Sequence, residues 1–431
     1  MGLQVIWTDY ARKIFDDKIS TLITDARILT INLFHAYLLN ELHENNKLQV
    51  ATEKFSSWKT ERDARFGLLI LLEDIFIHIF YEQEKLGDKS IVSDGLIGML
   101  KANQVHRGKN PIRIRAEQNA GILTRQIQLG MMGRNKGGMI SMGIFNGDLL
   151  ILPDTRQRIQ DHFSQWESSV RLKNHLHNFI NEIVLKSSRN KQFPELDYET
   201  IRSTKLFKAV RDGYIEVFGK RTLPKDIIRF WKDRLGFNSG ASLALYDAVG
   251  KKSGKEESID IYKVMKDAYE DLAEELGEQQ KIEAILRIEP FLSMADYTFR
   301  YISRKDFKKI DDHKKELKIL REELRSAGHE DKLQANHSDT HKRLKELRSV
   351  MVAPDLSLED WIAEIIKYHK KIMDGRKNSV WLELQANGSI KHIQSASLAE
   401  DLSLDTFLQK RPWFHGYYVE SIHSLRKILN S

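Results

Sequence analysis

Residues that end helices are scarce in this sequence. Proline occurs 7 times and glycine 24 times in 431 residues, so long stretches lack the residues that interrupt a helix. A β-sandwich or a loop-rich secreted domain needs many more turn residues than this. The chain is therefore expected to be mainly α-helical.

Composition narrows the class of protein further. Hydrophobic residues make up 41% and charged residues 30%, which is enough apolar material for packed cores and too little bias for disorder. A chain of this length is expected to hold several packed units. Cysteine is absent, which excludes disulfides, thiolate zinc sites, iron–sulfur clusters and cysteine nucleophiles.

The most apolar segment, residues 66–81, carries Glu73, Asp74 and His78. It is too short and too charged to span a bilayer, so we interpret it as a buried core helix. A second wide apolar helix is predicted over 29–42, and the two are expected to pack on each other. The first residues do not have the pattern of a signal peptide. We therefore expect a cytoplasmic protein that does not contact a membrane.

Changes of pattern along the chain predict five units. They are an N-terminal helical unit (1–88), a basic module (89–153), a central helical unit with a helix-turn-helix-like pair (154–302), a charged hairpin (303–351) and a C-terminal helix/β-hairpin/helix unit (352–431). Leucines at near-heptad spacing predict that 303–351 is an antiparallel, coiled-coil-like helical hairpin projecting from the body. Glu289-Pro290 is expected to break the helix before it.

Residues 89–153 are predicted to form a winged-helix-like module. The pattern predicts a short helix ending near Lys101, a basic loop, a helix over 116–129, the Gly-rich turn GRNKGG and a β-hairpin at Asn146-Gly147. Asn-Gly between apolar runs is typical of a tight hairpin, because both residues tolerate positive φ. A second hairpin is predicted around Asn387-Gly388.

Positive charge is concentrated in the same module. The chain has a net charge of +7, and eight Lys or Arg residues lie within 101–138 against the single acid Glu117. Such clustering, with glycines that let the backbone approach, is typical of phosphate binding. In a winged helix, Arg125, Gln126 and Gln128 would face base edges. The cations expected to contact phosphates are Arg107, Lys109, Arg113, Arg115, Arg134 and Lys136. The alternative is a solvated basic face on a protein-interaction domain.

A second candidate for nucleic-acid contact is the helical pair at 203–218 and 223–235. Lys225, Arg229 and Lys232 share one outer face of its second helix. Such a pair can enter a DNA groove, or it can be a plain packing unit.

Catalytic patterns are incomplete. Arg171 and His177 have the spacing found in HEPN-type helical ribonucleases, in which an Arg and a His flank an RNA 2′-OH, although Leu172 stands where a polar residue is usual. Asp374 and Glu383 resemble part of a magnesium nuclease site, but Gln385 replaces its lysine.

The acids of the core helix leave two interpretations open. Asp74 and His78 are i, i+4 neighbours, so they could act as a base or half of a metal site. They could equally be satisfied core hydrogen-bonding groups.

The favoured hypothesis is a non-catalytic nucleic-acid-binding (DNA rather than RNA) or scaffolding subunit of a larger assembly. It would use no cofactor and no metal, and a protein partner would dock on 303–351. One alternative is a HEPN-like, metal-independent ribonuclease using Arg171 and His177. Another is a protein-interaction adaptor that does not bind nucleic acid.

Overall fold

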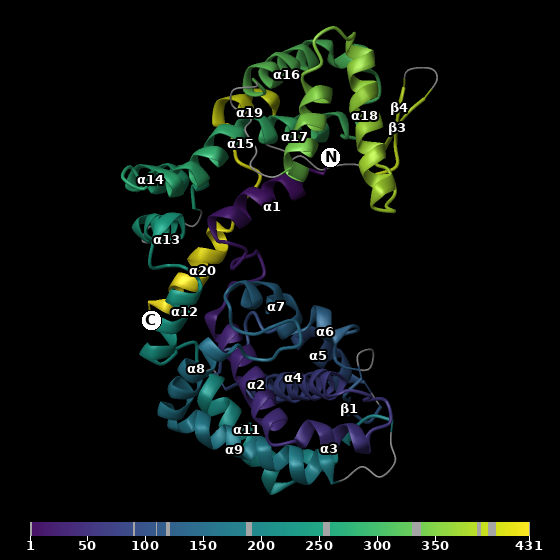
Figure 1. Cartoon of the computed structure of the whole chain (residues 1–431). Helices are drawn as coiled ribbons and strands as arrows, with labels where there is room; N and C mark the ends of the chain where they lie inside the picture. Colours follow the sequence, from purple (N-terminus) through teal and green to yellow (C-terminus); the bar gives the residue numbers. More distant parts are fainter. Residues whose placement is uncertain are drawn as a thin grey trace. The chain divides into compact units, whose positions relative to one another are not determined.

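The structure is a computed structural model that describes residues 2–88, 91–108, 110–117, 121–186, 192–252, 259–329, 338–385, 389–394 and 402–430. Across these ranges the chain is mainly helical, with two small antiparallel two-stranded sheets (Figure 1). This confirms the fold class expected from the scarcity of helix-ending residues. Within the same ranges, every helix is too short or too polar to cross a bilayer.

Internal contacts divide the chain into two units that interleave in sequence. Unit 1 comprises Met1–Phe15 and Ser239–Val419, and unit 2 comprises Asp16–Asn238 and Glu420–Ser431. Each unit is thus built from an early and a late part of the chain.

Unit 1 is built mostly of helices. They are α1 (Leu3–Ile14), α13 (Gly240–Lys252), α14 (Ile261–Asp271), α15 (Leu276–Ile302), α16 (Lys314–Ala327), α17 (Ser338–Met351), α18 (Leu358–Gly375) and α19 (Leu404–Lys410). A 3-10 turn at Ile310–His313 precedes α16, and strands β3 (Leu382–Leu384) and β4 (Ile390–His392) follow α18. The amphipathic α1 buries Leu3, Ile6, Trp7 and Tyr10 and packs on α15 and α17 (Figure 1).

The break expected at Glu289-Pro290 is wrong, because α15 runs through Pro290 without interruption. Proline removes one intrahelical hydrogen bond. However, Ile288, Glu289 and Phe291 around it are all buried. Tertiary packing of this face therefore outweighs the local cost.

The segment 303–351 does contain the two predicted helices, α16 and α17, but the expected projection from the body is wrong. Leu317, Leu320 and Leu324 of α16 are fully buried. The helix packs on α15 and α18, and α17 packs on α18 and α1. α16 and α17 also pack on each other, as the hairpin prediction requires, but the body of unit 1 covers their apolar side and only the charged faces stay exposed.

Unit 2 contains the remaining elements. Its helices are α2 (Ala26–Glu44), α3 (Lys47–Lys54), α4 (Glu61–Lys85), α5 (Met99–Arg107), α6 (Gln126–Leu129), α7 (Met131–Ser141), α8 (Pro153–Gln165), α9 (Glu167–Phe179), a π-helical turn (Ile180–Leu185), α10 (Tyr198–Arg202), α11 (Lys205–Phe218), α12 (Lys225–Arg234) and α20 (Val419–Leu429, of which Val419 belongs to unit 1). Strands β1 (Arg113–Arg115) and β2 (Glu195–Asp197) pair with each other.

The core of unit 2 is the helix pair predicted from its apolar patterns. α4 begins at a capping box in which Thr60 and Asp63 bond each other's backbone N–H groups, and such a box stabilises a helix start. Residues 64–81 of α4 are buried throughout, and α4 packs on α2. Both predictions, a buried helix over 66–81 and its contact with 29–42, are confirmed.

The winged-helix arrangement is not confirmed. Among the described residues of the helix predicted over 116–129, only the four of α6 are helical, and GRNKGG is part of helix α7 rather than a turn. Met131, Met132 and Met139 of α7 are buried, and α7 packs on α2. Burial of this apolar face outweighs the low helix propensity of its glycines.

Of the two predicted hairpins, one is a pair of short strands and the other is reduced to a single bridge. β3 pairs with β4 in the register Leu384↔Ile390, and the turn residues 386–388 lie outside the described ranges. At Asn146-Gly147 the pairing is a single bridge between Phe145 and Ile151. Here Asn40 of α2 takes over the hydrogen bonds of a strand partner, because its side-chain N–H donates to Leu149 O (3.0 Å) and its Oδ1 accepts from Ile151 N (3.1 Å).

Candidate nucleic-acid interface

Helix α4 is the platform on which the basic segment lies. α5 and α6 pack on α4, and α6 packs on α7 (Figure 1). α5 starts after Gly98, which has φ of 108°, and a Cβ at Gly98 would contact Ile122 of the segment leading to α6. The parts of the segment before and after β1 therefore lie close together on one platform.

Glu73 of α4 holds the start of α7. It is 1% exposed and accepts hydrogen bonds from Met132 N and Gln126 Nε2, both at 2.7 Å. A Cβ at Gly130 would overlap this carboxyl group, so glycine is required for the close approach. Burial raises the pKa of Glu73 to about 7, although the bonds from Met132 and Gln126 oppose the rise.

Asp74 and His78, the i, i+4 pair, contact different groups. Asp74 accepts from Ile122 N at 3.2 Å, and burial raises its pKa well above the ordinary value. His78 Nδ1 lies 2.9 Å from His106 Nε2 of α5, and burial lowers the pKa of His78 to about 3. These contacts agree with the satisfied core interpretation, in which the acids and the histidine fasten α5 and 121–132 to α4.

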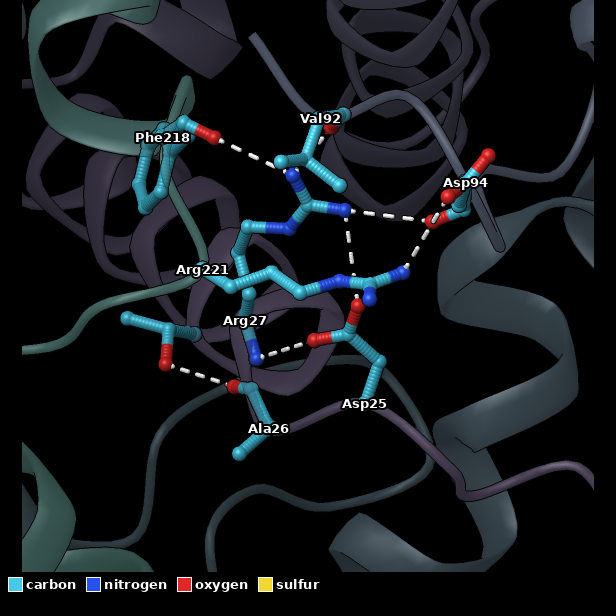
Figure 2. A network of polar contacts seen from close by, with 8 residues as sticks. Asp25, Ala26, Arg27, Val92, Asp94, Phe218 and Arg221 are labelled. Carbon is cyan, nitrogen blue, oxygen red and sulfur yellow. Dashed lines mark hydrogen bonds and ion pairs between the residues drawn. The ribbon is translucent and has the colours of Figure 1, made fainter. Parts of the chain in front are cut away.

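A buried arginine that the sequence did not suggest supports the approach to α5. Arg27 of α2 is 0% exposed, and its guanidinium donates to the carbonyls of Val92, Asp94 and Phe218 (Figure 2). Its other partner, Asp25, also caps α2 by accepting from Arg27 N at 2.7 Å. The network ties the chain before α5 to the end of α11. The only sequence signal was an Asp-x-Arg at a helix start, which is too common to be informative.

Six cations of the segment are exposed, and four of them, Lys101, Arg107, Arg125 and Arg134, are called the basic face. None of the four has an ion pair with an acid of the described ranges. Arg125 has φ of 58° at the start of α6, and Arg134 Nε donates to Leu129 O at 3.2 Å. Gln128 is also exposed, between these two arginines. The face thus offers uncompensated charge from three neighbouring helices.

The other predicted contact residues are engaged elsewhere. Arg113 and Arg115 of β1 pair with Asp197 (3.2 Å) and Glu195 (3.0 Å) of β2. Gln126 is 3% exposed and bonded to Glu73. Their charge and hydrogen bonds are therefore already used within the fold.

Lys136 is half-buried, lies over the Phe66 ring (5.0 Å) and donates to Gly147 O. Burial lowers its pKa. Lys109 lies outside the described residues.

The helix-turn-helix-like candidate contains the predicted helices, but α11 packs mainly on α9. Lys225 and Arg229 of α12 are exposed, and Arg229 pairs with Asp226 at 3.7 Å. Lys232 is half-buried and donates to Asn430 at 2.9 Å. This outer face is consequently less basic than the sequence suggested.

The two residues of the ribonuclease alternative are each held by acids on α9 and its neighbours. Arg171 bonds Glu167 (2.5 Å) and Glu216 (2.6 Å), while His177 Nε2 lies 2.9 Å from Glu41. Both side chains are thus engaged by acids of the fold, and these contacts give the ribonuclease alternative no support.

No protein-family model, curated protein or solved structure matches this chain. Among the described residues there is also no group of three His, Asp or Glu side chains placed to hold a metal ion.

Proposed function

We propose that unit 2 binds nucleic acid non-catalytically through the basic face. The observation that carries the proposal is that four exposed cations on α5, α6 and α7 have no ion pair with a described acid, whereas Arg113 and Arg115 beside them do. Cations without an ion-pair partner contribute the most to binding affinity when they displace counterions from a phosphate backbone. Since α6 has only four residues and the Gly-rich turn is a helix, contact would be with the backbone rather than through a wing and a recognition helix.

A salt titration of binding tests the proposal. The full chain should bind random duplex and single-stranded DNA and RNA at low ionic strength. On duplex DNA its log affinity should fall with log salt by about 0.9 per phosphate contacted. An Arg125→Ala/Arg134→Ala variant should weaken binding to all sequences and reduce the slope by about two units. A chain that shows no salt-sensitive binding to any of these probes would refute the proposal.

The matched control removes the same charge elsewhere. Lys266 and Arg287 of unit 1 are exposed and paired one turn away with Glu270 and Glu283. A Lys266→Ala/Arg287→Ala variant should therefore bind as the wild type does. An equal loss in both double variants would indicate a non-specific effect of net charge and would contradict a localised basic face.

A second candidate, protein docking within a larger assembly, is favoured by exposed apolar side chains beside the cations. Leu100 is 82% exposed and Leu129 is 38% exposed. Large apolar side chains on a surface are typical of contact sites when they cluster. If they serve a protein, Leu100→Ser/Leu129→Ser should leave affinity for single strands unchanged. A loss of affinity would instead mean that they contact bases. Of the partner surface predicted on 303–351, the charged outer faces of α16 and α17 remain available.

A further inference from the structure

A cavity of about 630 Å³ lies in unit 2 between the end of α4, α5 and the helices α10 and α11. His106 of α5 lines it, and the next residue, Arg107, belongs to the basic face. The cavity is therefore next in the chain to Arg107 of the basic face. Its volume falls within the range of pockets that hold a small ligand or a single nucleotide.

Four cations and one acid line this cavity. The cations are Lys85, Arg202, Lys208 and Arg211, and the acid is Glu82. Arg202 uses the Glu82 carboxylate (3.0 Å) and also pairs with Glu199 (3.1 Å). The one acid of the lining is thus engaged by one of the four cations.

Two of the remaining three cations have no ion pair with a described acid. Lys208 is exposed and has no ion pair with a described acid. Lys85 is exposed, lies over the Tyr81 ring at 5.5 Å and also has no ion pair with a described acid, whereas Arg211 pairs with its exposed neighbour Asp212 (2.8 Å). A concave site in which charges of one sign predominate focuses the electric field and concentrates counter-ions. The cavity therefore favours an anion with more than one negative charge.

A terminal phosphate meets this requirement better than an internal one. A phosphomonoester carries about −1.5 to −2 charge near neutral pH because its second pKa is about 6, whereas each internal phosphate of a strand carries one charge. An internal phosphate of a duplex also lies on the outside of a rod, where a hollow site cannot surround it. Of the apolar side chains in the lining, Leu86 is 78% exposed and offers surface to a sugar or base, whereas Tyr81 and Phe207 are largely buried.

We propose that this cavity receives the phosphorylated end of a nucleic-acid strand that lies on the basic face. The inference rests on the proposed function and deepens it, since it names the substrate as a strand with a terminal phosphomonoester. Lys208 and Arg211 contact the phosphate, and Lys85 completes the positive wall.

The test compares three single strands of one sequence, each with an internal fluorophore: one with a 5′-phosphate, one with a 3′-phosphate and one with hydroxyl ends. The full chain should bind one phosphorylated strand at least about tenfold tighter than the hydroxyl strand, a ratio equivalent to one good charge-assisted contact. The strand that binds more tightly shows whether the cavity accepts a 5′-phosphate or a 3′-phosphate.

Three variants show where on the protein the preference for a phosphorylated end arises. Lys208→Ala/Arg211→Ala should abolish the preference for the phosphorylated end and leave binding of the hydroxyl strand nearly unchanged. Lys205→Ala, which removes an exposed charge of the same helix outside the cavity, should keep the preference. Arg125→Ala/Arg134→Ala should weaken all three strands equally and keep the ratio.

Different results would refute the end-binding inference and the proposed function. Equal wild-type affinity for all three strands would overturn the end-binding inference and leave the proposed function standing. A preference that survives Lys208→Ala/Arg211→Ala would also overturn it, because the phosphate would then bind elsewhere. Absence of binding to every strand at low salt would overturn the proposed function and, with it, this inference.

Discussion

Both units bury a glutamate, but the two carboxyl groups are held by different kinds of donor. In unit 2, Glu73 accepts from the backbone of Met132 and from Gln126. In unit 1, Glu289 is 0% exposed and accepts from Trp7 Nε1 (2.7 Å), Tyr417 Oη (2.5 Å) and the Ser293 hydroxyl. Burial raises the pKa of each to about 7.

The difference shows two uses of the same buried group. Glu73 fastens one short stretch of irregular chain to the helix beneath it, so its effect is local. Glu289 joins side chains from the beginning, the middle and the end of unit 1. Its loss should therefore destabilise segments that are far apart in sequence. A buried acceptor stabilises whatever its donors belong to.

The largest effect is expected from Glu289→Ala. It leaves the Trp7, Tyr417 and Ser293 donors without their acceptor and opens a cavity, which should cost about 3–4 kcal/mol of the free energy of unfolding. Hydrogen exchange should increase in α1, in α15 and around Tyr417 together, while unit 2 stays protected. As a control, Glu283→Ala on the same helix removes only a surface pair with Arg287 and should change little. Increased exchange in α15 alone would contradict the joining role.

A change of pH should affect both units, and unit 2 the more. The folded pKa of each glutamate is about 7, above the ordinary 4.5. The stability that the protonated form contributes is thus complete below about pH 4.5 and lost as the pH rises through 7. The loss is about 3 kcal/mol for each glutamate. Burial also raises the pKa of Asp74 in unit 2 well above its ordinary value, which adds a loss of the same sign in that unit. Urea unfolding at several pH values, monitored by hydrogen exchange in each unit, measures this loss of stability.

The glutamine variants isolate the two groups in that experiment. Glu73→Gln should flatten the pH dependence of unit 2 and leave that of unit 1 intact, and Glu289→Gln should do the reverse. If both units keep their dependence in both variants, other groups are responsible.

Glu73→Ala should cost about 2 kcal/mol, because one backbone and one side-chain donor lose their acceptor. Hydrogen exchange should increase between residues 121 and 132, while α2 and the rest of α4 keep their protection. Affinity for single strands should fall as well, since Arg125 lies within that stretch. Exchange that increases throughout unit 2 would mean that Glu73 has the same wide role as Glu289.

The smallest effect is expected from Trp7→Phe, which keeps an aromatic ring and removes one donor to Glu289. The cost should be about 1–2 kcal/mol. Loss of a donor to the ionised carboxylate should raise the pKa of Glu289 further, and the pH at which unit 1 loses stability should rise with it. Ser293→Ala removes a different donor and should shift that pH in the same direction. An unchanged pH in both variants would show that these bonds do not stabilise the charge.

The candidate site was only partly predictable. The cluster of cations within 101–138 is visible in the sequence, but its division into paired and unpaired residues is not. Arg113 and Arg115 meet acids about 80 positions later in the chain, through a strand pair that has no turn signal between its members. Arg27 is likewise buried by groups from three distant segments, so no local pattern distinguishes it from a surface arginine.

By itself, the sequence determined the helical class, the buried helices over 29–42 and 66–81, and the hairpin around Asn387-Gly388. Each depends on periodicity or turn residues that act over a few positions. Only the tertiary structure decided that GRNKGG is helical, that α15 continues through Pro290, and that α16 and α17 pack on a body. In these places the burial of apolar faces outweighs local propensity, because packing energy depends on partners that the neighbouring residues do not specify.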